Sequence, residues 1–364
     1  MPSFRKRLDL FRGLLNGQFA KTGPLYVTWD IIGRCNLQCI GCPYHTPLKS
    51  HPPPARDFPF EVFQRLCDEL MEVGTCTVVL QGEGEPFLHP DLFRMIQAAK
   101  AKGFEVVTLT NGTLLTKDMC ERLLESGLDR LKVSMWATSP GEFEQNYPDT
   151  PGHVFDRMVD GLRRLSNYKK TQSASLPKAF LYYVINRNNQ YSLGNAVDLA
   201  VSTGCEGIYF SIMHDASKTV GSLMLEKDDM RRLDDDLEEA KTRLNQLHMV
   251  HNIDAVRFRI QIGEFVLDRV PCYSFWYHAR IGLDGQVFPC GRCDSKTDFG
   301  NIRTQSFEDI WNGGAIRGFR QLTMKPNAAK ELARICDCRY CCLLYDNMRV
   351  HRGFRHFRPF VQKA

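Results

Sequence analysis

The chain of 364 residues is 43% hydrophobic and 24% charged, with a formal net charge of +5. These values are ordinary for a soluble globular protein and exclude a wholly disordered chain. No run of about 18 apolar residues is present, and the N-terminal segment lacks the apolar core of a signal peptide. We therefore expect a cytoplasmic protein. The small positive charge lies largely near the two ends, so no nucleic-acid partner is expected.

The first 24 residues form a basic, amphipathic segment. A helical pattern places Phe4, Leu8, Phe11 and Leu15 on one face, with basic residues elsewhere. Such a helix can lie on an anionic membrane surface. For so short a helix we favour docking on its own domain.

Residues 25–250 alternate between strand and helix patterns. Expected strands cover 26–32, 77–81, 105–109, 130–134, 179–185 and 207–211, and expected helices cover 60–73, 90–102, 117–126, 155–166 and 193–203. Repeated βα units of this length predict an α/β fold with a parallel sheet. If the sheet curls into a barrel, its chemistry lies at the carboxyl ends of the strands. A further helix at 230–247 has one apolar seam and is expected to pack on the barrel.

A cysteine loop follows the first strand. Cys35, Cys39 and Cys42 stand at the spacing C-x3-C-x2-C. Three thiolates on one short loop predict a metal centre, and a [4Fe-4S] cluster held by three cysteines leaves one iron open to a small molecule. A zinc site normally needs a fourth ligand close by, which His45 can supply, so zinc remains the alternative.

The cysteine spacing resembles the signature of the radical S-adenosylmethionine (radical SAM) enzymes. The resemblance implies a partial (β/α)6 barrel, which agrees with the six strands counted above. It also implies that the open iron binds the methionine portion of S-adenosylmethionine, which is cleaved to a 5′-deoxyadenosyl radical. A non-catalytic iron–sulfur or zinc scaffold is the contrasting interpretation.

A glycine-rich turn directly after the second strand supports this resemblance. Gly82, Glu83, Gly84, Glu85 and Pro86 resemble the family's GGEP motif, with Glu83 where its first glycine is expected. The resemblance implies that the turn contacts the amino group of the methionine portion. Glycine permits the close approach that such a contact needs.

The next strands also end in polar residues. Asn111 follows the third strand and Ser134 ends the fourth, where the resemblance implies contacts with the ribose and carboxylate of the cofactor. Gly41 stands where the family often has an aromatic residue near the adenine, and Tyr44 is the candidate to replace it. After the sixth strand, His214 beside Asp215 is a candidate proton donor or acceptor, although a structural role is the commoner one.

A second cysteine set lies in the last hundred residues. Its members are Cys272, Cys290, Cys293, Cys336, Cys338, Cys341 and Cys342. A hairpin with an Asp-Gly turn is expected between the first two. The spacing resembles the auxiliary-cluster domain called SPASM, or its shorter form called twitch, which implies a small cysteine-rich α+β domain at 251–345. The ligands we expect for one auxiliary [4Fe-4S] cluster are Cys272, Cys290, Cys338 and Cys341. The other three cysteines compete for these places, and zinc is again the alternative.

These motifs together predict a radical SAM oxidoreductase followed by a basic tail at 346–364. The resemblance to single-cluster radical dehydrogenases implies hydrogen abstraction from a small polar substrate such as a sugar or aminocyclitol, with the auxiliary cluster accepting an electron. Only about two dozen residues precede the barrel, whereas peptide-modifying relatives often carry a leader-binding domain there. A peptide maturase, acting by epimerisation or cross-linking, is the alternative. A reducing donor such as flavodoxin or ferredoxin is the expected protein partner.

Overall fold

The computed structural model describes residues 3–46, 56–214, 221–263, 267, 270–293, 297–325, 328–336 and 341–354. Strands in these ranges form one nine-stranded sheet in the order β7-β6-β5-β4-β3-β2-β1-β8-β9. Their bounds are β1 Tyr26–Asp30, β2 Thr77–Gln81, β3 Glu105–Thr110, β4 Arg130–Ser134, β5 Lys178–Ile185, β6 Gly207–Ile212, β7 Val250–His251, β8 His278–Ile281 and β9 Val287–Phe288. Strands β1 to β6 match the six expected from the sequence, and neighbouring members pair in parallel. The predicted α/β class with a mostly parallel sheet is confirmed.

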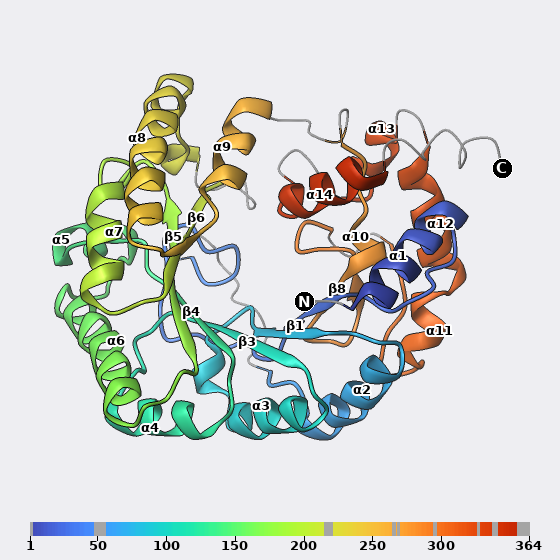
Figure 1. The fold of residues 1–364 in the computed structure, drawn as a ribbon, viewed down its shortest axis with the longest axis horizontal. Coiled ribbons are helices and arrows are strands. Elements are labelled where there is room, and N and C mark those ends of the chain that lie inside the picture. Colours follow the sequence, from blue (N-terminus) through green and yellow to red (C-terminus); the bar gives the residue numbers. More distant parts are fainter. Residues whose placement is uncertain are drawn as a thin grey trace.

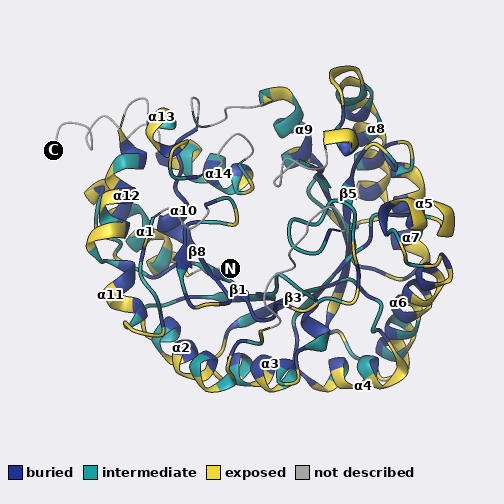
Figure 2. Cartoon of the chain, turned by 180° about the vertical axis from the view of Figure 1, so that it is seen from behind, coloured by how far each residue is buried: buried dark blue, intermediate teal, exposed yellow. Residues whose placement is uncertain are grey.

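Helices cover the outer, convex side of the curved sheet (Figure 1). The helices of the barrel region are α2 Phe60–Glu72, η1 Pro86–Leu88, α3 Leu92–Ala101, α4 Lys117–Glu125, α5 Pro140–Asn146, α6 His153–Thr171, α7 Leu193–Ser202, η2 Gly221–Leu223, α8 Lys227–Gln246 and α9 Ile253–Ile262. Figure 2 shows exposed residues along the outer faces of these helices and buried residues along the strands. The core therefore lies between the helices and the convex side of the sheet. No helix in the described ranges is long and apolar enough to cross a membrane.

The two faces of the sheet differ in how far they are buried. On β1, Val27 and Trp29 are fully buried, and Trp29 packs on Phe63 of α2 with ring centroids 4.4 Å apart. The alternate residue Thr28 is only half-buried. The same alternation recurs on β2 and β4. Because successive side chains of a strand point to opposite faces, the half-buried residues line a concave face that solvent reaches.

The C-terminal region continues the same sheet. Strand β8 pairs in parallel with β1, placing His278 beside Tyr26 and Arg280 beside Thr28. Strand β9 then turns back antiparallel to β8, as the Asp-Gly hairpin predicted. Gly285 in this turn has a φ of 89°, which glycine adopts without strain. The second cysteine set is therefore tied to the barrel through main-chain hydrogen bonds.

Helices α1 and α10 to α14 surround this region. Their bounds are α1 Phe4–Asn16, α10 Ser274–Tyr277, α11 Phe307–Trp311, α12 Gly314–Met324, α13 Ala329–Leu332 and α14 Leu344–Phe354. The N-terminal helix docks on Tyr273 and Trp276 through its residue Leu14, with Leu10 and Phe11 beside it. Of the face that the sequence predicted to be apolar, Phe4, Leu8 and Leu15 remain exposed. The sequence predicted that α1 docks on its own protein, but of these three docked residues it named only Phe11.

Candidate cluster and cofactor site

The cysteine loop lies directly beyond the carboxyl end of β1. The backbone N–H of Cys42 donates to the carbonyl of Cys39 at 3.0 Å, which closes the loop. The Cys42 sulfur accepts from the backbone N–H groups of Tyr44 and His45, at 3.4 and 3.2 Å. The sulfur thus lies against the main chain of the residues that follow it in the loop.

The three cysteines of this loop are close enough to interact electrostatically. Burial raises the pKa of Cys35 to about 11 and the pKa of Cys39 well above its usual value, and Cys42 raises both further by charge repulsion. Because their ionised forms repel one another, all three cysteines lose their protons together only when a positive metal centre binds them. No three His, Cys, Asp or Glu side chains of the described ranges sit together as ligands of a single ion. A tetrahedral zinc site would need sulfurs about 3.8 Å apart, from its Zn–S bonds of about 2.3 Å, whereas each iron of a [4Fe-4S] cluster takes its own thiolate. The donor set fits a cluster better than one zinc ion.

The glycine-rich turn after β2 packs against this loop. The backbone N–H of Gly84 donates to Ile32 at 2.9 Å, and that of Glu85 donates to Arg34 at 2.7 Å. A Cβ on Gly84 would overlap the Arg34 carbonyl, and one on Gly82 would overlap Ile32. Only glycine allows the two segments to lie this close. Pro86 opens the short helix η1 behind them.

Glu85 ties this turn to the end of β3. Its buried carboxylate accepts from the Thr110 hydroxyl at 2.6 Å and from the backbone N–H groups of Asn111 and Phe87 at 2.7 and 3.0 Å. Burial raises the pKa of Glu85 to about 7, although these three donors oppose the rise. Asn111 in turn donates to Asn36 on the cysteine loop at 2.8 Å. The turn, the loop and the end of β3 form one hydrogen-bonded unit.

A charged group that the sequence did not suggest lies beside this unit. Arg280 of β8 donates to Asp30, at the end of β1, at 2.7 Å and to the Tyr44 hydroxyl at 3.1 Å. Glu83 lies 3.7 Å from the same guanidinium, and Gln81 donates to Asp30 at 3.1 Å. Burial and the nearby Asp30 raise the pKa of Glu83. The Glu83 that replaces a glycine of the motif thus faces an arginine from the C-terminal region.

Trp136 and Met213 fill the space over Gly41. An added Cβ at Gly41 would lie 3.2 Å from the Trp136 ring and would clash with Met213. The Trp136 ring nitrogen donates to the Ser134 hydroxyl at 3.0 Å. The hydroxyl of Tyr44, the residue suggested from the sequence for adenine, accepts a hydrogen bond from Arg280 at 3.1 Å.

His214 lies at the end of β6 beside a separate cavity. This cavity has a volume of about 470 Å³, and three methionines, Met213, Met224 and Met230, contribute to its lining. His214 and Arg259 also line it. Asp215, the neighbour that suggested a polar pair, lies outside the described residues.

The C-terminal cysteines divide into two groups. Cys272, Cys290, Cys341 and Cys342 influence one another electrostatically. The hydrogen bond from Cys290 lowers the pKa of Cys342 to about 7 and holds the pKa of Cys290 well above its usual value. Cys338, expected as a ligand, lies outside the described residues, whereas Cys342 takes part in the group.

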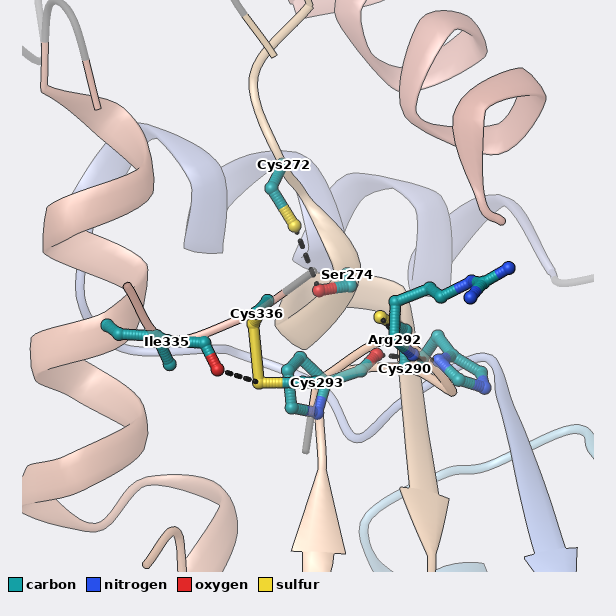
Figure 3. Close-up of a disulfide and its surroundings, with 9 residues drawn as sticks. Cys272, Ser274, Cys290, Arg292, Cys293, Ile335 and Cys336 are labelled. Carbon is teal, nitrogen blue, oxygen red and sulfur yellow. Dashed lines mark hydrogen bonds between the residues drawn. A yellow bond between two sulfur atoms is a disulfide. The ribbon is translucent and has the colours of Figure 1, made fainter. Parts of the chain in front are cut away.

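The other two described cysteines of this region, Cys293 and Cys336, form a disulfide (Figure 3). Cys293 also contacts the carbonyl of Ile335. In the same view, Cys272 contacts the hydroxyl of Ser274 at 3.1 Å and Cys290 accepts from the backbone of Arg292, both apart from the disulfide. The disulfide leaves the other group as the candidate ligand set.

Comparison with known families decides what this arrangement is. The family model of the radical SAM superfamily matches residues 29–189, which include the cysteine loop, the glycine-rich turn and strands β2 to β5. The SPASM model of an iron–sulfur cluster-binding domain matches residues 272–342. The chain belongs to the radical SAM superfamily. It is a radical SAM enzyme with a C-terminal SPASM domain.

Several known proteins resemble the chain over most of its length. It is 24% identical over 332 residues to the AdoMet-dependent heme synthase of Methanosarcina barkeri, covering 88% of this chain and 90% of that protein. It is 24% identical over 329 residues to the PqqA peptide cyclase of Granulibacter bethesdensis, covering 87% and 80%. The crystal structure of anSMEcpe with bound AdoMet shares the fold with a TM-score of 0.66 and 17% identity, over 93% of this chain and 99% of that one.

The radical SAM enzyme accordingly uses [4Fe-4S] clusters and S-adenosylmethionine. Its own residues fit the clusters, because each cysteine group brings together buried thiols whose ionised forms repel one another until a positive metal centre binds them. The sequence located both groups through their spacing. The sequence did not point to Asp30 and Arg280. The only signal for each was a charged residue within a strand that is otherwise largely apolar.

Proposed function

We propose that this radical SAM enzyme oxidises a small polar substrate bound on the concave face, with the second cysteine group accepting an electron through its cluster. One observation carries the proposal: both cysteine groups border that face. The first follows β1 at its carboxyl end, and Tyr26 at the other end of β1 lies within electrostatic range of Cys290 and Cys342. Polar side chains such as Thr28, Ser134 and Tyr182 line the face between them.

The residues have distinct tasks in this proposal. Cys35, Cys39 and Cys42 hold the cluster that, with S-adenosylmethionine, supplies a 5′-deoxyadenosyl radical. The turn 82–86, with Asn111 and Ser134 on the neighbouring strand ends, positions the cofactor by hydrogen bonds. His214 and Tyr44 are proposed to contact substrate.

The second cluster has four proposed ligands. Cys272, Cys290 and Cys341 are three of them, and either Cys338 or Cys342 is the fourth. A cluster closed by four thiolates has no open iron, so it can only exchange electrons or support the fold. Oxidation of a CH–OH group to a carbonyl removes two protons and two electrons. One hydrogen atom leaves with the deoxyadenosyl radical, and then one proton is lost and one electron passes to the second cluster.

The test is the replacement Cys341→Ala, with Cys120→Ala as the matched control in the barrel core. Reduced enzyme is supplied with S-adenosylmethionine and a panel of ring-deuterated sugars and aminocyclitols. We expect Cys341→Ala to transfer deuterium into 5′-deoxyadenosine but to form no oxidised product, because hydrogen abstraction precedes loss of the electron. Cys120→Ala is expected to make both. Full product formation by Cys341→Ala would refute the electron-accepting role.

A peptide substrate is the second candidate. The cavity beside His214 is lined largely by apolar side chains, including three methionines, and methionine adapts to side chains of varied shape. The similarity to PqqA peptide cyclases points the same way. Deuterium transfer from labelled peptides but from none of the sugars would favour this candidate over the first.

A further inference from the structure

Strand β4 presents an unpaired amine to the concave face. Its residues Arg130, Lys132 and Ser134 alternate with fully buried Leu131 and Val133 and so point to that face. Arg130 is paired with Glu105 at 2.7 Å. Lys132 has no hydrogen-bond or ion-pair partner among the described residues, and its amine faces the Tyr209 ring at 4.9 Å from the centroid.

The groups around Lys132 do not neutralise it. Arg130 and Glu105 at the strand starts already form a pair. Asp346 of α14 attracts the amine from a distance, but its carboxylate accepts from the Tyr26 hydroxyl at 3.1 Å. From β5 and β6, the flanking residues Phe180 and Tyr209 contribute rings packed on each other with centroids 5.3 Å apart. Lys132 is therefore a cation that lies over the Tyr209 ring and has no direct counter-ion within the part of the chain that the structure describes.

Burial lowers the pKa of Lys132 to about 8. At pH 7 the amine is still mostly protonated, because its pKa lies about one unit above the pH. A half-buried ammonium that faces only an aromatic ring among the described residues loses hydration that no hydrogen bond there replaces. Such groups are frequent in binding sites, where a ligand supplies the missing charge.

We propose that Lys132 forms an anion-binding subsite on the concave face and that the substrate carries a carboxylate or phosphate group that binds there. This inference rests on the proposed function and names the substrate's chemical class. Ser134 lies two residues further along β4, about 6.6 Å away at the rise of a parallel strand. A small substrate anchored at Lys132 thus extends toward the end of β4, where Ser134 is proposed to position the cofactor. Tyr182 is the register partner of Ser134 on β5.

Chemical labelling of the amine tests this proposal without turnover. Reconstituted enzyme loaded with S-adenosylmethionine, but not reduced, is treated with acetic anhydride over a range of pH, and each lysine is quantified by mass spectrometry. Lys117, whose side chain is 74% exposed, serves as the internal control. We expect half-maximal labelling of Lys132 near pH 8.

Inorganic phosphate and acetate are then added as probes. At about ten times its dissociation constant, the preferred anion should reduce labelling of Lys132 about tenfold and leave Lys117 unaffected. Protection by phosphate alone assigns a phosphate group, and protection by acetate alone a carboxylate. Protection by neither anion, or an amine that does not react at any pH, would overturn the proposal.

Calorimetry with the same anion provides a second readout. Lys132→Met should abolish the binding heat, whereas Lys132→Arg should retain it because the positive charge remains. Equal binding by Lys132→Met would also overturn the proposal. Neither measurement requires radical formation, so failure of the proposed function would appear separately, as absence of deuterium transfer in the wild-type enzyme.

Discussion

Replacing Arg280 by Met tests whether the buried ion pair joins the barrel to the SPASM domain. The Arg280 side chain is 10% exposed and that of Asp30 is 1% exposed, and two guanidinium nitrogens contact one carboxylate oxygen at 2.7 and 2.5 Å. In Arg280→Met the Asp30 carboxylate stays buried and, among the residues that the structure describes, keeps only its hydrogen bond from Gln81. An uncompensated charge in this position is costly because water cannot reach it.

We expect Arg280→Met to lower the free energy of unfolding by about 3–5 kcal/mol, the usual cost of removing one partner of a buried pair. In Asp30→Asn combined with Arg280→Met, neither charge remains, and most of that loss should be regained. The coupling free energy from the double-mutant cycle should therefore be about 2–3 kcal/mol. As a control, Arg12→Met removes a surface arginine that is 60% exposed and pairs with Asp9, and should change stability by less than about 0.5 kcal/mol.

The assay is anaerobic urea unfolding followed by tryptophan fluorescence. Trp29 is fully buried beside Asp30 on β1 and reports on this region. Iron content is matched between the proteins before each measurement, so that differences in cluster loading do not enter the cycle. A coupling below about 0.5 kcal/mol would refute the reasoning, because it would mean that water or another group compensates Asp30 when Arg280 is removed.

Two further predictions concern the cofactor site. Replacing the three cysteines of the loop 35–42 by Ala should remove about four irons per chain and leave the second cluster, because each cluster takes its own thiolates. Iron and sulfide analysis of reconstituted protein checks this. Loss of all iron would contradict two independent sites. Gly84→Ala should cost about 1–3 kcal/mol of stability and weaken S-adenosylmethionine binding, since its Cβ would push against the Arg34 carbonyl. Gly194→Ala, where nothing lies within 4 Å of the added Cβ, should instead stabilise helix α7 by about 0.5–1 kcal/mol; equal effects of the two changes in thermal unfolding would contradict the packing argument.

The sequence by itself determined the fold class and both cysteine sets. Strand and helix patterns depend on the spacing of apolar residues within one element, and a cluster-binding loop depends on cysteines a few residues apart. Both signals are local, so the strands β2 and β4 and the loop 35–42 could be predicted from single stretches of sequence. The sequence also showed that Glu83 departs from the family motif, but it did not show that Glu83 faces Arg280.

Only the tertiary structure decided which distant residues meet. Arg280 faces Asp30 because β8 pairs with β1 in one particular register, and a register shift of one residue would turn Arg280 to the other face. Among the described residues Lys132 has no ion-pair partner, and Asp346 of α14 accepts from Tyr26 instead. The N-terminal helix docks through Leu14 because the aromatic residues that receive it come from the C-terminal region. None of these contacts is encoded by periodicity within one element, since each joins segments that only folding brings together.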